Sequence, residues 1–319
     1  MSYFVAVTDS PVAKDLSIER SVLSGIKVER VSWQDEASLI EALVEADGVL
    51  CMHAPMTARV VRRLPHCRVI GTSGTGLDNI DVEAARAENI FVSGVNDYCT
   101  EEVANHTLAL ILGWNRKLLR GHRFVIEKRW NERTLTTGNW GFVPIHRLSD
   151  QTLGLIGFGF ISQAVVCRAK AFGMEVLAYS RHPDQSLADR LGVRIAGLNG
   201  ILQQADFVSL HIPLTDLTRH FMNGERIGRM KPGAVLVNTA RGALVDDEAL
   251  LEGLRSQSLG GALIDVYQKA PLPVDHPFRV LDNVILTPRI AFYSEAALNS
   301  MRRLAAEIVR DRLKGERDS

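Results

Sequence analysis

Two glycines follow an apolar run and precede a helical pattern. The run covers residues 152–156, the turn contains Gly157 and Gly159, and the helical pattern continues over residues 161–172. Strand, glycine turn and helix in this order bind a dinucleotide, because the turn lets the backbone approach the pyrophosphate at the helix N-terminus. Ser162 takes the third position of the motif, where a small residue keeps helix and strand close. We predict a dinucleotide site, with a purely structural turn as the alternative. The predicted contacts are Gly157, Gly159, Phe160 and Ile161.

The residues after the next expected strand bear on the choice of dinucleotide. This strand ends in Tyr179-Ser180-Arg181, where NAD sites carry an Asp or Glu that accepts from the ribose hydroxyls. No carboxylate is present, and an arginine guanidinium matches a 2′-phosphate in a bidentate contact. We predict NADP(H) as the preferred cofactor, bound through Ser180 and Arg181, with NAD(H) as the alternative. A solvated loop arginine is the simpler interpretation.

Composition limits the classes of protein to consider. The 319 residues are 46% apolar and 23% charged, which predicts a two-domain globular chain. Lys+Arg and Asp+Glu both number 37, which argues against nucleic acid or a membrane surface as a partner. No apolar run is long enough to span a bilayer, and the first residues resemble a strand rather than a signal peptide, so we expect a cytoplasmic protein. We expect no metal site or disulfide but buried, reduced cysteines at Cys51, Cys67, Cys99 and Cys167.

Short apolar runs alternate with helical patterns along most of the chain. This alternation predicts parallel sheets with helical crossovers, hence an α/β fold of two doubly wound, Rossmann-like domains. Strands are expected over residues 4–7, 28–31, 48–51, 69–72, 91–92, 151–156, 176–179, 207–211, 235–238, 261–265 and 284–286. Helices are expected over residues 36–45, 82–88, 101–117 and 294–314, among others.

The domain boundaries follow from this order. We expect a discontinuous substrate domain of residues 1–102 and 288–319, a dinucleotide-binding domain of residues 103–287, and an active site in the cleft between them. The helix over residues 101–117 is too apolar for a surface helix. Residues 120–150 are expected to form an irregular arm with Trp130 and Trp140, and the helix and arm together predict a homodimer.

Several further motifs carry a family resemblance over nearly the whole chain. The segments 73–81 (SGTGLDNID), 97–104 (DYCTEEVA), 211–215 (HIPLT) and 237–242 (VNTARG) resemble the D-isomer-specific 2-hydroxyacid dehydrogenases, especially their branch near the C-terminal binding protein corepressors. The resemblance implies substrate contacts at His53, Gly74, Thr75, Gly76 and Tyr98. It implies further cofactor contacts at His211, Pro213, Thr239, Ala240 and Asp265.

The resemblance breaks at the catalytic centre. The family mechanism uses an arginine that holds the substrate carboxylate, a histidine that transfers the proton and a glutamate that orients the histidine. Arg241 matches the arginine, but Ala270 precedes Pro271 where the glutamate is expected, and Arg289 follows Thr287-Pro288 where the histidine is expected. Arginine is a poor general acid because its pKa lies above about 12, and positioned acid–base catalysis contributes roughly 10²–10⁴ in rate.

Two consequences follow from these replacements. Another group must supply the proton, and the sequence offers Lys269, His53, Tyr98 and Tyr293, each of which also has an ordinary structural interpretation. Arg241 and Arg289 together would form a dicationic pocket that requires an anion, unless Arg289 turns outward to pair with a surface acid.

Three functions are therefore open. The first is an NADP(H)-dependent oxidoreductase acting on the CH–OH group of a small anionic, carboxylated substrate. The second is a repurposed enzyme that catalyses elimination, decarboxylation or transient oxidation. The third is a nucleotide-sensing binding protein, because residues 291–296 (AFYSEA) resemble the corepressors.

Overall fold

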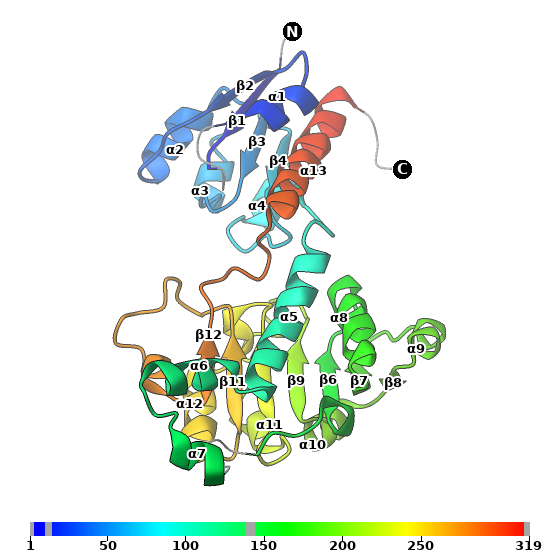
Figure 1. Cartoon of the computed structure of the whole chain (residues 1–319). Helices are drawn as coiled ribbons and strands as arrows, with labels where there is room; N and C mark the ends of the chain where they lie inside the picture. Colours follow the sequence, from blue (N-terminus) through cyan, green and yellow to red (C-terminus); the bar gives the residue numbers. More distant parts are fainter. Residues whose placement is uncertain (1–2, 10–14, 138–143, 316–319) are drawn as a thin grey trace. The chain divides into compact units, whose positions relative to one another are not determined.

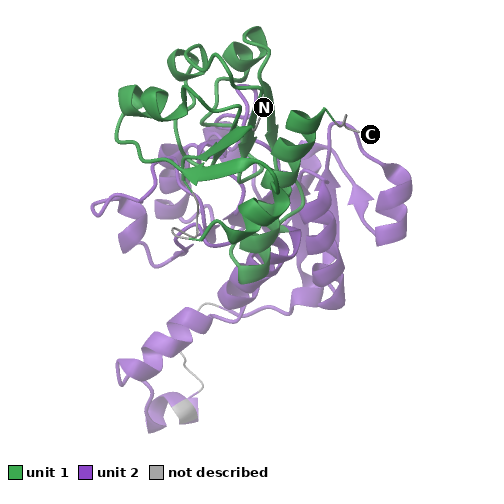
Figure 2. Cartoon of the chain, turned by 90° about the horizontal axis from the view of Figure 1, so that it is seen from above, with its two compact units in different colours: residues 1–99, 293–319 green, residues 100–292 purple. Residues whose placement is uncertain are grey.

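The chain forms two compact α/β units. A computed structural model describes residues 3–9, 15–137 and 144–315. Unit 1 comprises residues 1–99 and 293–319, and unit 2 comprises residues 100–292 (Figure 2). The expected boundaries at residues 102/103 and 287/288 lie a few residues from these. Both units carry a wholly parallel sheet, so the predicted α/β class with two Rossmann-like sheets is confirmed.

Unit 1 is built on a five-stranded sheet of order β2-β1-β3-β4-β5 (Figure 1). Its strands are β1 (Phe4–Val7), β2 (Lys27–Arg30), β3 (Gly48–Cys51), β4 (Val69–Thr72) and β5 (Phe91–Gly94). Its helices are α1 (Ser17–Val22), α2 (Glu36–Leu43), α3 (Ala58–Val61), α4 (Val82–Ala87) and α13 (Glu295–Lys314).

The last helix completes the core of unit 1. Ala305, Ala306 and Val309 of α13 pack with Val5 and Leu50 of the sheet in one buried cluster. The fit is close, since a Cβ on Gly48 or Gly71 would lie 3.0 or 2.9 Å from a Val309 methyl. Glycine at these two strand positions therefore lets α13 approach the sheet.

Unit 2 is built on a seven-stranded sheet of order β12-β11-β10-β9-β6-β7-β8. Its strands are β6 (Thr152–Ile156), β7 (Glu175–Tyr179), β8 (Arg194–Ile195), β9 (Phe207–Leu210), β10 (Val235–Asn238), β11 (Gly261–Ile264) and β12 (Val284–Leu286). Its α-helices are α5 (Thr100–Asn115), α6 (Leu118–Ile126), α7 (Glu132–Thr137), α8 (Phe160–Ala171), α9 (Gln185–Leu191), α10 (Leu198–Gln204), α11 (Gly224–Gly228) and α12 (Asp247–Arg255). The described part of this unit also contains the 3₁₀ helices η1 (Leu148–Asp150), η2 (Gly242–Leu244) and η3 (Pro277–Val280).

Helices cover both faces of this second sheet. One buried cluster contains residues of α5, α8 and α9, and the other contains residues of α10, α11 and α12. Two apolar layers explain why the strands are nearly continuous apolar runs rather than alternating ones. Among the helices that the structure describes, none is both long and apolar enough to cross a bilayer.

Two details correct the sequence expectations. Much of the arm expected to be irregular is helical, because α6, α7 and η1 lie within residues 118–150. Trp130 is exposed, whereas Trp140 lies outside the described residues. Cys51, Cys67 and Cys99 are buried as predicted, but the prediction for Cys167 is wrong, since it lies on an exposed position of α8.

Candidate active site

The glycine turn after β6 leads directly into α8, as the motif requires. Gly157 has φ +108°, and a Cβ there would overlap the His211 carbonyl. Gly159 has open space at its Cβ position and precedes the first residue of α8. Only glycine suits the first position, and the second leaves the helix N-terminus accessible to an anion. These residues therefore fit a dinucleotide pyrophosphate.

The three residues that follow this turn differ in their exposure. The Phe160 side chain is 65% exposed, whereas Ile161 is half-buried in the α5–α8 core. Ser162 is fully buried, and its Oγ has no hydrogen-bond partner among the described residues. A small apolar residue would leave no orphaned hydroxyl here.

The loop after β7 presents the residues expected to select the cofactor. The Ser180 Oγ accepts from the His182 backbone N–H at 3.3 Å, which orders the turn. Arg181 is exposed, and its guanidinium has no ion pair with any residue that the structure describes. The side chain is therefore free to meet a phosphate.

A neutral histidine lies at the end of β9. The His211 ring Nε2 is 2.9 Å from the Ser209 Oγ. Burial lowers the pKa of His211 from 6.5 to about 4, so the ring is uncharged at neutral pH. The Pro213 carbonyl accepts from the Thr218 hydroxyl at 2.7 Å, which fixes the following loop. His211 and Pro213 are therefore held at the carboxyl edge of the sheet, where α/β proteins bind ligands.

Arg241 follows β10 in a loop fixed by Asn238. The Asn238 side chain donates to the Arg241 carbonyl at 2.9 Å and accepts from the Ala240 N–H at 3.1 Å. The Arg241 side chain is partly exposed, and its Nη1 donates to the Ala240 carbonyl at 2.9 Å. Gly242 allows a close approach, since a Cβ there would overlap the Tyr267 backbone. The Arg241 loop therefore packs directly on the segment after β11.

Asp265 connects the segment after β11 to the segment after β12. Its buried carboxyl group accepts from the Thr287 hydroxyl at 2.6 Å and from the N–H groups of Ile290 and Ala291, both at 2.9 Å. The Asp265 N–H in turn donates to the Asn238 carbonyl at 3.0 Å. One carboxyl group thus fixes residues 287–291 beside the loop that carries Arg241. The sequence predicted a cofactor contact for Asp265, whereas the structure shows its buried carboxyl group engaged in these internal hydrogen bonds.

Arg289 lies at the centre of the fixed segment. Its φ is +57°, and its N–H donates to the Thr287 carbonyl at 3.0 Å. A left-handed conformation is unusual for a non-glycine residue and is found where surrounding contacts impose it, often at functional sites. The side chain is exposed, and no acidic residue of the described chain forms an ion pair with it.

Ala270 occupies the position where the family's glutamate is expected. Ala270 is exposed and carries only a methyl group. Nearby, the Tyr267 hydroxyl donates to the Thr287 carbonyl at 2.7 Å, and burial raises the pKa of Tyr267 to about 12. Tyr267 therefore supports the segment of residues 287–291 and is a poor proton donor at neutral pH.

His106 was missed by the sequence reasoning. It lies on α5, and its Nε2 is 3.1 Å from the Thr287 Oγ1 and 3.6 Å from an Asp265 oxygen. The next residue, Thr107, contacts the Thr239 hydroxyl at 3.1 Å. Two adjacent residues of α5 thus contact the segment after β12 and the loop after β10. Nothing local in the sequence indicated this, because the partners lie 181 and 132 positions away.

The expected substrate residues belong to unit 1 and lie at the carboxyl ends of its strands. Asp9 accepts from the N–H groups of Met52 and His53, at 2.9 and 2.5 Å. Gly74 and Thr75 contact the end of β5, where Val95 donates to the Gly74 carbonyl at 2.9 Å and accepts from the Thr75 hydroxyl at 3.0 Å. Gly76 belongs to the same loop, and Tyr98 is half-buried against the α13 side of the sheet.

A comparison with protein families decides what this architecture is. The family profile described as "D-isomer specific 2-hydroxyacid dehydrogenase, NAD binding domain" matches residues 108–291. The chain belongs to this family. It is accordingly an NAD(P)-dependent oxidoreductase of the 2-hydroxyacid dehydrogenase type. The predicted resemblance is confirmed at the level of the family, and the replacement of the catalytic pair remains an inference from the sequence.

Known relatives vary in substrate and cofactor. A glyoxylate reductase of Korarchaeum cryptofilum is 35% identical over 86% of this chain and 83% of its own. A D-lactate dehydrogenase from Aquifex aeolicus, solved with NAD and lactic acid, has a TM-score of 0.85 at 28% identity and covers 98% and 96% of the two chains. An acyclic imino acid reductase (Bsp5), solved with NADPH and D-Arg, has a TM-score of 0.83 at 27% identity, with 98% of each chain covered. Both cofactors are therefore found among solved structures similar to this chain.

No group of three or more His, Cys, Asp or Glu side chains suited to a metal ion occurs among the residues that the structure describes. The polar side chains of the centre are instead engaged with hydroxyl and backbone groups.

Proposed function

We propose that this dehydrogenase uses NADP(H) to interconvert a small 2-hydroxy acid and its 2-keto acid through an altered catalytic centre. The supporting observation is the Asp265 carboxyl group, which fixes Arg289 in a left-handed conformation beside the Arg241 loop. The guanidinium groups of Arg241 and Arg289 favour a substrate with a carboxylate and a developing oxyanion.

Each residue then has a specific role. NADPH, when bound, supplies the hydride, and Gly157, Gly159 and the α8 N-terminus would hold its pyrophosphate. Ser180 and Arg181 would hold the 2′-phosphate, while Phe160, Ile161, His211, Pro213, Thr239 and Ala240 remain proposed cofactor contacts. Arg241 binds the substrate carboxylate, and Arg289 stabilises negative charge on the reacting oxygen. His53, Gly74, Thr75, Gly76 and Tyr98 remain candidate substrate ligands.

The proton route requires a group other than Arg289. Lys269 is exposed in the loop after β11, and the Tyr293 hydroxyl is hydrogen-bonded to Glu295 at 3.1 Å. His106 differs from the groups named from the sequence because it contacts Thr287 within the centre itself. We propose that His106, held at the centre by its contact with Thr287, is the group that exchanges the proton. In this role His106→Gln lowers the rate of keto-acid reduction while leaving NADPH binding unchanged.

Cofactor preference has a direct test. NADPH should bind at least tenfold more tightly than NADH, which corresponds to about 1.4 kcal/mol. Arg181→Ala should remove most of that difference, and Ser180→Asp should favour NADH, because a carboxylate accepts from ribose hydroxyls and repels a phosphate. Equal affinities of the unaltered protein for the two cofactors would exclude this assignment.

The altered centre is tested by turnover of a panel of 2-keto acids with NADPH. Arg289→Ala should weaken substrate binding or turnover strongly. Arg289→His alone should not restore ordinary activity, because Ala270 cannot orient the ring, whereas Ala270→Glu with Arg289→His should increase keto-acid reduction. If the unaltered enzyme turns over at ordinary rates, on the order of 10 per second, and Arg289→Ala matches it, Arg289 is not part of the centre.

Arg289 forms no ion pair with an acidic residue of the described part of the chain, and this also favours two other functions. Substrate consumption without net NADPH oxidation would support a repurposed enzyme that performs elimination, decarboxylation or transient oxidation. Tight NADPH binding with no turnover of any tested acid would support a nucleotide-sensing binding protein. Both outcomes replace the proposed reaction while keeping the family.

We also propose that the chain acts as a cytoplasmic homodimer without nucleic-acid or membrane partners. Helix α6 supports the dimer, since Leu118, Val125 and Ile126 are each more than half exposed. An exposed apolar stripe of this kind is a common subunit contact. Leu118→Glu with Val125→Glu should convert a dimer to a monomer in light scattering at micromolar concentration. A monomeric mass for the unaltered chain would contradict the proposal.

A further inference from the structure

The hydrogen bonds at Asp265 run in one direction only. Its two carboxyl oxygens accept from the backbone N–H groups of Ile290 and Ala291, which cannot accept in return. The third partner is the Thr287 hydroxyl, which lies 2.6 Å from the carboxyl oxygen that Ile290 also contacts. An ionised carboxyl group accepts and does not donate, so the single hydroxyl hydrogen of Thr287 belongs to this contact.

This direction extends to His106. The ring Nε2 lies 3.1 Å from the Thr287 hydroxyl oxygen and 3.6 Å from the carboxyl oxygen of Asp265, so the hydroxyl is within hydrogen-bonding distance and the carboxyl group is not. Because Thr287 gives its hydrogen to Asp265, its oxygen can only accept from the ring. The hydrogen is therefore on Nε2. A neutral imidazole has one N–H, which leaves the lone pair of Nδ1 as the basic site of His106.

Thr287 is held by all of its polar groups. Its N–H donates to the Ile264 carbonyl at 2.9 Å. Its carbonyl accepts from the Tyr267 hydroxyl at 2.7 Å and from the Arg289 N–H at 3.0 Å. If the Thr287 hydroxyl turned to donate to the ring, the buried Asp265 carboxyl group would lose one of its donors, which is unfavourable away from water. The backbone contacts and the hydroxyl contact thus favour the same orientation.

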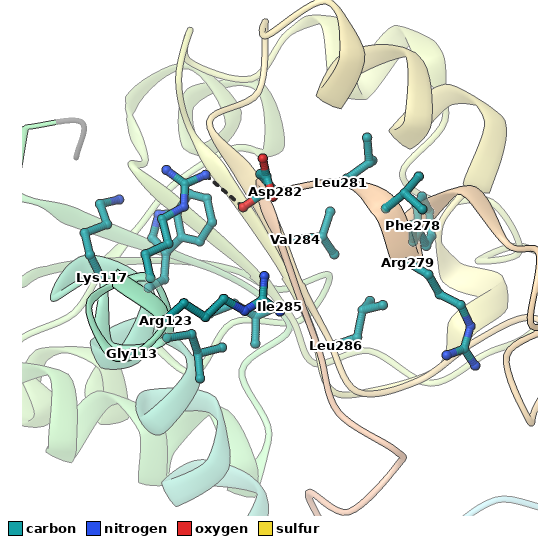
Figure 3. A pocket seen from close by; sticks show the side chains of 14 residues that line it. Gly113, Lys117, Arg123, Phe278, Arg279, Leu281, Asp282, Val284, Ile285 and Leu286 are labelled. Atoms are coloured by element: carbon teal, nitrogen blue, oxygen red, sulfur yellow. Dashed lines mark hydrogen bonds between the residues drawn. The ribbon is translucent and has the colours of Figure 1, made fainter. Parts of the chain in front are cut away.

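Helix α5 is fixed beside the same edge of the sheet. Thr107, the residue after His106, contacts the Thr239 hydroxyl at 3.1 Å. Further along the helix, Gly113 lines a pocket together with all of β12, the strand that ends just before Thr287 (Figure 3). Helix α5 therefore runs alongside β12, and the His106 ring has a fixed place beside Thr287.

We propose that Thr287, directed by Asp265, is a positioning residue that keeps a hydrogen on Nε2 of His106, so that Nδ1 is the atom that exchanges the proton. The inference rests on the proposed role of His106 in keto-acid reduction. In that reaction the carbonyl carbon receives a hydride from NADPH, which leaves as NADP⁺, and the carbonyl oxygen receives the proton of Nδ1. His106 is then neutral, with its remaining hydrogen on Nε2, and Nδ1 takes up a new proton from solvent.

NMR of the full chain labelled with ¹⁵N-histidine measures the tautomer, because a ring nitrogen with a hydrogen and one without differ in chemical shift. His106→Gln identifies the signals of His106. At a pH at which the ring is neutral, the unaltered chain should carry the hydrogen on Nε2 and none on Nδ1. Thr287→Val removes the acceptor, so the ratio of the Nε2–H form to the Nδ1–H form should fall at least tenfold, and Thr287→Ser should restore it.

Two further measurements separate this role from a general structural one. Thr152→Val is the matched control, because Thr152 is a half-buried threonine of β6 whose hydroxyl contacts no histidine in the described structure. Amide exchange at Ile290 and Ala291 shows whether the segment after β12 stays closed in Thr287→Val. In keto-acid reduction Thr287→Val should lower kcat at least tenfold and leave KM within about twofold, because Arg241 still binds the carboxylate.

Two results would overturn the proposal. One is a hydrogen on Nδ1 of His106 in the unaltered chain, a measurement that needs no Thr287 variant and so decides even if Thr287→Val opens the segment. The other is a Thr287→Val variant that stays closed and keeps the tautomer ratio of the unaltered chain. Failure of the proposed function is distinguishable, because it would appear as the expected tautomer in a protein that reduces no keto acid.

Discussion

The Asp265 carboxyl group provides the sharpest test of how the centre is held. Asp265→Asn preserves shape but replaces one acceptor oxygen by a donor. In one amide orientation the new NH₂ group faces the Ala291 N–H, and in the other it faces the Ile290 N–H. Either way one backbone donor loses its partner inside the protein.

The expected magnitude follows from that loss. A hydrogen bond to a charged group contributes roughly 1.5–3 kcal/mol, and a buried unpaired donor costs about 1–3 kcal/mol. We therefore expect Asp265→Asn to destabilise the closed form of residues 287–291 by about 2–4 kcal/mol. Arg289 adds to the effect, because its left-handed backbone costs roughly 1–2 kcal/mol and relaxes once the segment opens.

Amide hydrogen exchange measures this directly. At about 1.4 kcal/mol per factor of ten, the amides of Ile290 and Ala291 should exchange roughly thirtyfold to several hundredfold faster in Asp265→Asn. Asp275→Asn is the matched control, since Asp275 is exposed in the same unit. If Asp265→Asn exchanges at the rate of the control, the carboxyl group does not hold the segment, and the argument for a fixed Arg289 fails.

Three further perturbations probe other parts of the structure. The pKa of His211 is lowered from 6.5 to about 4 in the folded protein, so the unfolded chain binds more protons between these values and the free energy of unfolding falls on acidification. Between pH 7 and pH 5, His211→Asn should lose about 2 kcal/mol less of its free energy of unfolding than the unaltered chain, as measured by urea denaturation. Gly261→Ala should lower the melting temperature by several degrees, because its Cβ would overlap the Trp114 ring and lie 2.7 Å from the Asn283 carbonyl, an overpacking worth about 1–3 kcal/mol; unchanged melting in calorimetry would contradict this contact. Glu19→Met should destabilise unit 1 by about 3–5 kcal/mol by leaving the buried Arg302 unpaired, and denaturation of Glu19→Met with Arg302→Met should recover much of it; equal losses in the single and double variants would refute the pairing.

The strands were predictable because burial on both faces makes them short apolar runs. The runs over residues 4–7, 48–51 and 235–238 coincide with β1, β3 and β10. Strand β8 was missed because it has only two residues, Arg194 and Ile195. Helix α6 was missed because Phe124 is its one buried residue among those described, and its other apolar side chains are exposed instead of packed on the sheet.

In the candidate site, too, the residues carried by local motifs were predictable, whereas the long-range contacts were not. Gly157, Gly159 and Arg241 were found because local motifs carry them, and their conformations are set by near neighbours. The links that assemble the centre run from Asp265 to Ala291 and from His106 to Thr287, between segments that are distant in sequence. No local pattern encodes such contacts, so the structure was needed to show which groups meet Arg289's segment.

The place of α13 has a consequence for synthesis on the ribosome. The sheet of unit 1 is translated first, yet Val309, which packs on Gly48 and Gly71, is translated more than two hundred residues after β5. At about 5–20 residues per second, the nascent chain waits roughly 10–40 s for that helix. All of unit 2 is translated within this interval, while Val5 and Leu50 lack their contacts with α13. The core of the N-terminal unit is therefore the last to be completed, and the sheet face that α13 later covers is the surface on which a chaperone would act.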